Sequence, residues 1–300
     1  VVLMYFSRWK PKLIFSVQSF NRLFSFGSKL MLSNILTNIY LNLNNLVIGK
    51  KYTSADLAFY NRGFTLSQFP SVNLSDVMNR IIYPVLSEVQ DDMETLRKEY
   101  LRYLHLAHFI ILPLMGLLIV LAEPLVRVLL TDKWLEAVPY IQIFSINFML
   151  YPIIQQSSNP VAAIGHSGIL LKYQVLKRGV SLAILIYTIT ISVRAICWGC
   201  VVGSLFEAVV NLLIVRKEIG VGLREHLKSQ MYVIVTVAVI CTTVYFGTML
   251  ISGALWKLLL GGVIGLALYV ATTYIFNFQE KEYLVGTLNK IRSLINTKRK

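Results

Sequence analysis

The fold is decided by residues 57–92, LAFYNRGFTLSQFPSVNLSDVMNRIIYPVLSEVQDD, an apolar segment that carries a regular set of polar side chains. The chain around it is strongly apolar. Of the 300 residues, 56% are hydrophobic and 15% are charged, and the mean hydropathy is +0.63. A soluble domain carries about 25% charged residues, and a soluble protein of this composition would expose large apolar patches. The sequence therefore predicts an all-α integral membrane protein.

Eight apolar segments are long enough to cross a membrane as helices, since a crossing needs roughly 20 residues. They lie at 25–48, 55–86, 101–122, 136–162, 168–192, 195–215, 229–251 and 254–276. The first two are the most polar. No hydrophilic stretch between the segments is long enough to form a separate soluble domain, so we expect about eight transmembrane helices and little else.

The basic residues are distributed unevenly between the two sides of the predicted membrane. With residues 1–29 placed in the cytoplasm, 22 of the 29 Lys and Arg residues fall on the cytoplasmic side and six on the outer side, while Arg62 lies inside a span. This asymmetry is the positive-inside pattern of membrane proteins. It accounts for the net charge of +14. We therefore expect both ends of the chain in the cytoplasm and no nucleic-acid partner.

The two ends of the chain are predicted to lie at the membrane surface. Residues 1–6 (VVLMYF) are too short to span and are followed by basic residues, as at the end of a truncated helix, so we expect a missing N-terminal part. Residues 13–24 place apolar side chains at helical spacing and predict an interfacial segment. Residues 280–300 predict a basic, weakly amphipathic cytoplasmic tail.

Polar side chains gather on one face of the second span. At 100° per residue, Asn73, Asp76 and Arg80 lie close to the direction of Arg62. A charge inside a membrane usually faces a wet cavity, although a shallow arginine can instead reach the headgroups. Pro70 permits a bend in the same helix. We interpret this face as the lining of a cavity.

Asparagines form a second polar face, on the first span. Asn34, Asn38, Asn42 and Asn45 are separated by four, four and three residues, which is one side of a helix. Amide side chains in a membrane either hold helices together or line a polar passage. A third polar patch, residues 155–159 (QQSSN), precedes Pro160 in the fourth span.

The remaining cysteine, histidine and acidic motifs do not indicate a catalytic, redox or metal site. Residues 197–200 (CWGC) have redox or metal spacing but lie in an apolar span without a second cysteine pair, and ordinary packing explains them. His105 and His108 lack a nearby carboxylate, and the acids at 91–92 belong to a charged cytoplasmic connection. The chain has no Walker A motif. We therefore expect no enzyme activity, no cofactor and no metal site.

In the order and spacing of three segments, the chain resembles the polysaccharide flippase family (Wzx/WzxC-like), within the multidrug/oligosaccharidyl-lipid/polysaccharide exporter superfamily. The segments are 26–92 (beginning FGSKLMLSNILTNIY), 109–134 (FIILPLMGLLIVLAEPLVRVLLTDKW) and 155–168 (QQSSNPVAAIGHSG). The motifs are diffuse, but the resemblance covers nearly the whole chain.

The resemblance implies a fold of two six-helix lobes followed by two further helices. This chain would then be the second lobe (25–217) and the two additional helices (218–279), between a truncated helix with its linker (1–24) and the tail (280–300). It further implies an alternating-access flippase in the bacterial inner membrane. Such a flippase would move undecaprenyl-diphosphate-linked oligosaccharide outward for O-antigen, capsule or exopolysaccharide synthesis.

The resemblance also implies roles and partners. Related lipid II flippases carry an arginine matching Arg62, whose implied role is to hold the diphosphate; Asn73, Asp76 and the Asn38, Asn42 and Asn45 face would shield it and the sugar. The energy would come from an ion gradient or the membrane potential. The partners implied are membrane lipids, the missing N-terminal lobe and the polysaccharide polymerase machinery.

The chain departs from the family at one point, and other functions stay open. Many relatives carry an aspartate where this chain has Asn44 and Asn45, which puts ion coupling there in doubt. A drug or cation antiporter would need a membrane acid, for which Asp76 and Glu207 are the candidates. A membrane polysaccharide polymerase or glycosyltransferase, and an interaction protein without transport activity, are the remaining alternatives.

Overall fold

The computed structural model describes residues 16–165 and 167–275. These residues form helices, with no strand among them, as the sequence predicts. The expectations for residues 1–15 and for the tail beyond 280 lie outside the described residues.

The helices follow the predicted spans closely. The first three are α2 (Val17–Lys51), α3 (Ser54–Glu88) and α4 (Met93–Val120). A short hairpin of α5 (Ala122–Leu129) and the 3-10 helix η1 (Asp132–Ala137) follows. The rest of the chain forms α6 (Val138–Met149), α7 (Tyr151–Gln156), α8 (Ser158–Ala163), α9 (Ser167–Thr188), α10 (Val193–Ile219), α11 (Leu223–Met249) and α12 (Ala254–Ile275).

Five helical segments of the described part are long and apolar enough to cross a membrane, judged by length and composition. They are α4, the series from η1 through α8, α10, α11 and α12. The helices α2, α3 and α9 occupy the other three predicted spans but fall outside this set, because they carry the asparagines and charged side chains. The polar helices are therefore the places to look for a function.

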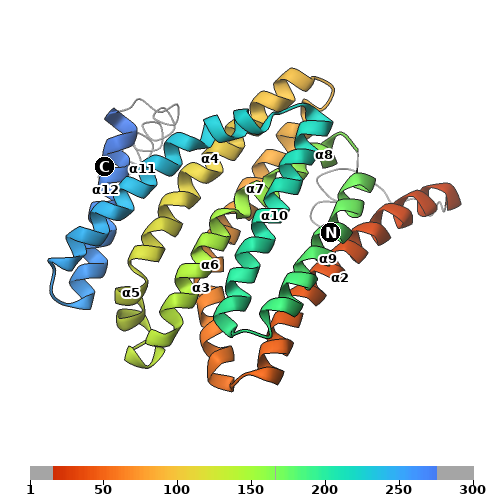
Figure 1. The fold of residues 1–300 in the computed structure, drawn as a ribbon. Coiled ribbons are helices and arrows are strands. Elements are labelled where there is room, and N and C mark those ends of the chain that lie inside the picture. The colour runs from red at the N-terminus through yellow and green to blue at the C-terminus, as the bar shows by residue number, and fades with distance from the viewer. Residues whose placement is uncertain (1–15, 166, 276–300) are drawn as a thin grey trace, which may run out of the picture.

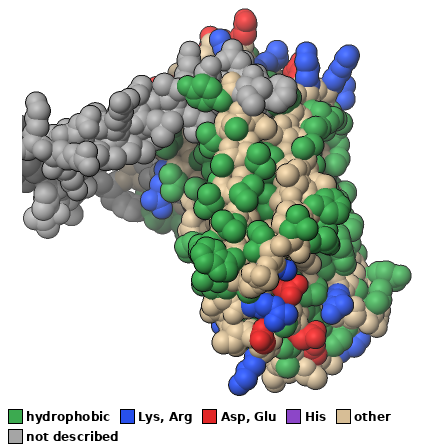
Figure 2. Space-filling view, turned by 90° about the vertical axis from the view of Figure 1, so that its left-hand side faces the viewer, with side chains coloured by type: hydrophobic (Ala, Val, Ile, Leu, Met, Phe, Trp, Pro, Cys, Tyr) green, Lys and Arg blue, Asp and Glu red, His purple; other side chains and the backbone are tan. Residues whose placement is uncertain are grey.

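The long helices lie side by side and are tilted in the same general direction (Figure 1). α3 packs mainly on α6, α9 on α10, and α11 on both α4 and α12. α2 lies against α9 and α3, at the opposite side of the molecule from α12. Figure 2 shows hydrophobic side chains over the middle of the face near α12, with charged side chains at both ends. That distribution is what a bilayer requires.

Side-chain N-caps determine where α3 and α4 begin. Thr53 and Asp56 form a capping box at the start of α3, with the Thr53 hydroxyl accepting from the Asp56 amide at 3.1 Å. Asp92 caps α4 by accepting from the Glu94 amide at 3.1 Å and the Thr95 amide at 3.2 Å. Such caps satisfy amides that the first helical turn leaves without partners.

Two differences from the predicted boundaries have local causes. The segment at 13–24 is not separate from the first span, because α2 already begins at Val17 and runs on without a break. The span predicted at 136–162 is divided into α6, α7 and α8. Pro152 lies in the first turn of α7, and its missing N–H leaves the carbonyl of Phe148 without its helical donor. The Ser71 hydroxyl of α3 donates to that carbonyl at 2.9 Å.

The same use of a proline fastens α12 to the bundle. Pro113 lies inside α4 and leaves the carbonyl of Phe109 without its helical donor. The Tyr269 hydroxyl of α12 donates to this carbonyl at 2.7 Å. The carbonyls freed by Pro113 and Pro152 thus both accept a hydrogen bond from a side chain of a neighbouring helix. Membrane proteins accommodate proline in this way.

Candidate functional site

The candidate site lies on the open face of α3, which carries the charged residues predicted from sequence. Arg62 is half-buried, and Asn73, Asp76 and Arg80 are exposed. All four project within about 40° of one direction at 100° per residue. Phe69, 70% exposed, lies on the same side. The structure therefore brings the predicted α3 residues together on one unpacked surface.

The opposite face of α3 determines this rotation. Gly63, Ser67, Ser71 and Ser75 recur every four residues and are buried. The Ser67 hydroxyl donates to the carbonyl of Ile141 in α6 at 2.9 Å. Small residues at this spacing let two helix backbones approach closely. Because this face is held against α6, the charged face must point away from the lobe.

Arg62 rests on an aromatic ring instead of on an acid. Its guanidinium carbon lies 4.8 Å from the centre of the Trp134 ring in η1, and Phe59 meets the same ring edge-on with centroids 5.9 Å apart. A cation at this distance from an indole is attracted by its π-electrons. Within residues 16–165 and 167–275, no carboxylate forms an ion pair with Arg62. This contact could not be predicted from the sequence, because Trp134 belongs to a segment about 70 residues away from Arg62.

Two other predicted residues of α3 differ in their bonding. Asn73 donates its amide to the carbonyl of Phe69, one turn earlier, at 2.7 Å. Asp76 is exposed and forms no ion pair with another described residue. The Asp76 carboxylate is thus available for interaction with hydroxyl groups or cations.

The asparagines of α2 do not share one environment. Asn42 is exposed and Asn45 is half-buried, while the side chain of Asn38 is outside the described residues. Asn44, which the predicted face omitted, is buried and donates to the Cys200 sulfur of α10 at 3.9 Å. The Oδ1 atoms of Asn44 and Asn45 are buried without a hydrogen-bond partner among the described residues. The C-terminal part of α2 therefore carries polar groups into the lobe as well as onto its surface.

Three charged residues meet inside the lobe, between α9 and α10. The Lys177 ammonium lies 3.2 Å from Glu207 Oε1, and the Arg178 guanidinium lies 3.8 Å from Glu207 Oε2. Lys177 also donates to Asn211 Oδ1 at 3.0 Å. The side chains of Lys177 and Glu207 are 6% and 12% exposed. A central charge in a membrane helix costs about 2.5–3.5 kcal/mol on insertion scales, so this cluster calls for a role.

The position of these two cations corrects the charge count made from sequence. The 22 basic residues counted on the cytoplasmic side include Lys177 and Arg178. In the structure both lie in the middle of α9, within the lobe. Without these two residues the sequence still predicts 20 basic residues on the cytoplasmic side and six on the outer side. The signal that could have located the cluster was Glu207, the one acidic residue between 137 and 217.

The polar patch at 155–159 forms a hydrogen-bonded network at the break between α7 and α8. Asn159 donates to Asn79 of α3 and to Gln156, each at 2.9 Å. The Ser157 hydroxyl lies 3.0 Å from the Tyr100 hydroxyl of α4, which lies 3.0 Å from Nε2 of His226 in α11. These two sets of hydrogen bonds connect the α7–α8 break to α3, α4 and α11, which explains why a broken, polar segment lies inside the bundle.

The histidines and cysteines predicted to be structural make contacts of that kind. His105 Nδ1 lies 2.7 Å from the carbonyl of Ser229, and His108 Nδ1 lies 2.9 Å from the carbonyl of Leu104. The thiols of residues 197–200 are free, the first buried and the second partly buried. No group of His, Cys, Asp or Glu among the described residues is arranged to hold a metal ion.

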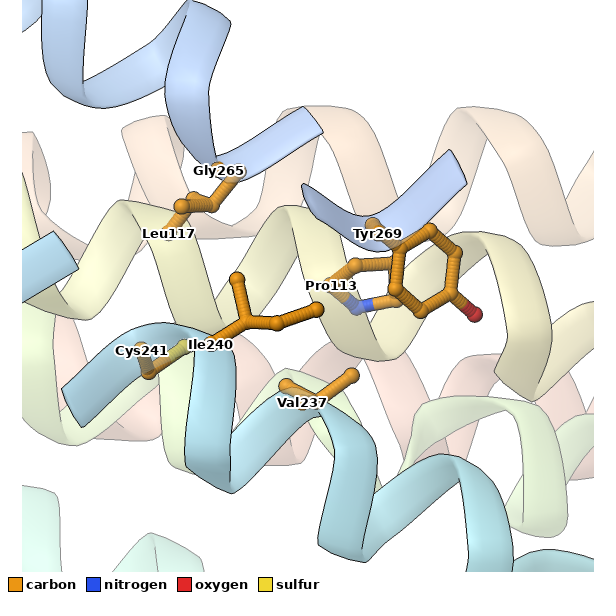
Figure 3. Close-up of a pocket in the computed structure, with 7 residues that line it drawn as sticks. All are labelled: Pro113, Leu117, Val237, Ile240, Cys241, Gly265 and Tyr269. Carbon is orange, nitrogen blue, oxygen red and sulfur yellow. The ribbon is translucent and has the colours of Figure 1, made fainter. Parts of the chain in front are cut away.

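A small pocket between α4, α11 and α12 is apolar (Figure 3). Its lining consists of Pro113, Leu117, Val237, Ile240, Cys241, Gly265 and Tyr269. The one strongly polar group, the Tyr269 hydroxyl, already donates to the Phe109 carbonyl. The pocket offers nothing to recognise a sugar or a phosphate, so the α3 face is the better candidate site.

Comparison with known proteins agrees with this architecture. Residues 1–139 match the family described as polysaccharide biosynthesis protein. The chain is 25% identical over 162 residues to the lipopolysaccharide biosynthesis protein WzxC of Escherichia coli, covering 53% of this chain and 32% of that protein. These matches support the predicted resemblance to the polysaccharide flippase family.

Other relatives come from different bacteria. The teichuronic acid biosynthesis protein TuaB of Bacillus subtilis is 21% identical over 178 residues, covering 57% of this chain and 37% of that protein. The succinoglycan biosynthesis transport protein ExoT of Rhizobium meliloti is 24% identical over 217 residues, covering 72% and 42%. The chain matches about a third to two fifths of the length of these relatives.

The fold has a counterpart among solved structures. The lipid II flippase MurJ in its inward closed conformation superposes with a TM-score of 0.73 over 94% of this chain and 60% of that one, at 15% identity. At that identity the likeness concerns the fold alone. It confirms the predicted flippase-like arrangement of helices.

Proposed function

We propose that this chain is part of a flippase that carries undecaprenyl-diphosphate-linked oligosaccharide from the inner to the outer leaflet. The observation that carries the proposal is Arg62, a cation on the open face of α3 that no described carboxylate neutralises. Known relatives by name act in polysaccharide biosynthesis and transport.

The chemistry of Arg62 suits a diphosphate. A guanidinium presents paired N–H donors that match phosphate oxygens bidentately. Trp134 contacts Arg62 through the π-face of its ring, and this contact does not use a carboxylate that the substrate would have to displace. Binding therefore avoids the cost of breaking an existing ion pair before the phosphate can be held.

The remaining groups of the face suit a sugar. Asn73 and Asp76 are exposed one to two turns beyond Phe69 on α3, and both can hydrogen-bond to hydroxyl groups. Asn42 and Asn45 of α2, with Asn38, would extend the polar lining. The lipid tail would remain in the bilayer, next to the apolar surface of the helices. Alternating access would then expose this face to each side of the membrane in turn.

The proposal includes the setting in which the chain works. The second wall of the cavity would come from the part of a full-length flippase that the curated relatives have and this chain does not match. The protein would lie in the bacterial cytoplasmic membrane with its C-terminus in the cytoplasm. It would deliver substrate to a polysaccharide polymerase outside and would catalyse no covalent reaction.

The test is the loss of flipping in full-length protein when Arg62 is replaced. Two charge-assisted hydrogen bonds at about 1.5–3 kcal/mol each predict that Arg62→Ala slows outward movement by at least about tenfold. Arg62→Lys should fall between, since an ammonium is a point charge without the paired donors. The assay measures how fast labelled lipid-linked oligosaccharide in vesicles becomes accessible to an external glycosidase.

The matched control is Lys133→Ala, which removes an exposed cation from the η1 segment beside Trp134. It should leave the rate unchanged. Unaltered flipping with Arg62→Ala would remove Arg62 from the mechanism. Export of an organic cation, with no movement of the glycolipid, would favour the antiporter alternative, for which exposed Asp76 would be the acid.

A further inference from the structure

The buried charges between α9 and α10 take no part in the proposed diphosphate site. Glu207 accepts the Lys177 ammonium at 3.2 Å and lies 3.8 Å from Arg178. Lys177 is the eleventh of the 22 residues of α9, and Glu207 is the fifteenth of the 27 residues of α10. Both therefore lie near the middle of their helices, at the depth where charge is most costly.

The cluster cannot be explained by stability. A buried ion pair is generally no more stabilising than apolar side chains of similar volume, because both ions lose their hydration. The neighbouring residues Val161, Val210 and Ile214 form an apolar cluster, so apolar packing was available at this position. Ionisable residues that persist at membrane depth are commonly part of ion or proton pathways.

Few other titratable groups surround Glu207. Lys177 and Arg178 face it from α9. Tyr151 of α7 is within electrostatic reach of both Glu207 and Asp76. On α10 itself, Asn211 connects the cluster to α7 by donating to the carbonyl of Ile154 at 3.0 Å. Within residues 16–165 and 167–275, Glu207 is the carboxylate that pairs with both Lys177 and Arg178.

We propose that Glu207 is the coupling site of transport and that its ligand is a proton, not a metal cation. This inference rests on the proposed function. A sodium ion would need several oxygen ligands, but the groups that contact Glu207 in the described part of the chain are the Lys177 ammonium and the Arg178 guanidinium, which supply none. A proton can bind here because it adds to a carboxylate oxygen as an O–H bond and needs no further ligands.

Protonation of Glu207 has a structural consequence. A neutral carboxyl no longer attracts Lys177, which would keep only the Asn211 oxygen among its described partners. α9 and α10 touch closely elsewhere, since a Cβ at Gly199 would lie 3.0 Å from Ile184 and Thr188 side chains. Loss of the central ion pair would therefore loosen this contact at its middle. Through Asn211 the change reaches α7, beside the break at Ser157.

One test measures proton binding without transport. Infrared difference spectra of the reconstituted full-length protein should show a protonated-carboxyl band that grows on acidification and is missing in Glu207→Gln. Glu218→Gln, which removes an acid from the cytoplasmic end of the same helix, should keep the band. If wild type and Glu207→Gln give the same difference spectrum, Glu207 is not the proton site and the inference is overturned.

The second test measures coupling. An imposed pH gradient should accelerate flipping by wild type and by Glu218→Gln, whereas Glu207→Gln should flip at the rate seen without a gradient. Sodium should make no difference. Thermal unfolding in detergent checks that Glu207→Gln is folded. A sodium-dependent wild type, or a pH response that survives in Glu207→Gln, would refute proton coupling, while absence of flipping in all conditions would refute the proposed function alone.

Discussion

The contact between Arg62 and Trp134 shows how one residue can prepare a site for its ligand. An arginine held by an acid would have to exchange one anion for another when a diphosphate arrives. The indole ring positions the guanidinium through its face and leaves its N–H groups for phosphate oxygens. Trp134 is on this view a positioning residue for Arg62, although it need not touch the substrate.

This role predicts the effect of replacing Trp134. A cation–π contact contributes about 0.5–2 kcal/mol, depending on its desolvation, so Trp134→Leu should weaken binding of undecaprenyl diphosphate to full-length protein by about 2- to 30-fold. Trp134→Phe should lose less, since it keeps a smaller ring. Titration of the solubilised protein measures the Kd. Trp198→Leu, at a half-exposed tryptophan of α10, serves as the control; an equal loss there would show that the effect is not local.

Among the elements, α3 depends most on close packing. A Cβ added at Gly63 would lie 2.5 Å from the Tyr140 Cβ and 2.9 Å from the Tyr140 carbonyl carbon in α6. Backbone atoms cannot turn aside as a side chain can, so α3 would have to move away. Gly63 is followed on the same face of α3 by three more small, buried residues, Ser67, Ser71 and Ser75. The charged face of α3 is held outward by the fit of the opposite face.

Gly63→Ala should therefore destabilise the protein even though alanine favours a helix. Overpacking of a tight contact costs about 1–3 kcal/mol, which should appear as a lower midpoint of thermal unfolding in detergent. Gly262→Ala, in α12 where a Cβ would meet nothing within 4 Å, should be neutral or slightly stabilising. Equal midpoints for both variants would contradict the close approach of α3 and α6.

The same element shows what the sequence can and cannot predict. Hydrophobic length located the helices, and the 100° rotation placed Arg62, Asn73 and Asp76 on one side, because both depend only on local geometry. The partner of Arg62 depends on how the hairpin of α5 and η1 meets α3, and the partners of Glu207 depend on how α9 meets α10. The polar groups at the breaks near Pro152 and Ser157 likewise find their hydrogen-bond partners, Ser71 and Tyr100, on other helices. Contacts of this range have no local sequence signal.

At the scale of the whole molecule, polarity changes from one side to the other. The helices at one side of the molecule, α11 and α12, are apolar enough to be surrounded by lipid. The opposite side contains α2 and α9, while α3 lies between the two sides against α4 and α6; these three are the long described helices that fall outside the set of apolar spans. Such a gradient suits a lobe that faces lipid on one side and an aqueous cavity on the other.

The charge distribution predicts how this lobe is inserted. Without Lys177 and Arg178, which the structure places inside the lobe, cytoplasmic basic residues still far outnumber outer ones. In full-length protein from which Cys197, Cys200 and Cys241 have been removed, a cysteine at exposed Thr190 should react with a membrane-impermeant maleimide added to intact spheroplasts. A cysteine at exposed Asp91 should react only after the membrane is opened. The reverse labelling would invert the topology, and the open face of α3 would then have to bind and release the diphosphate from the opposite sides.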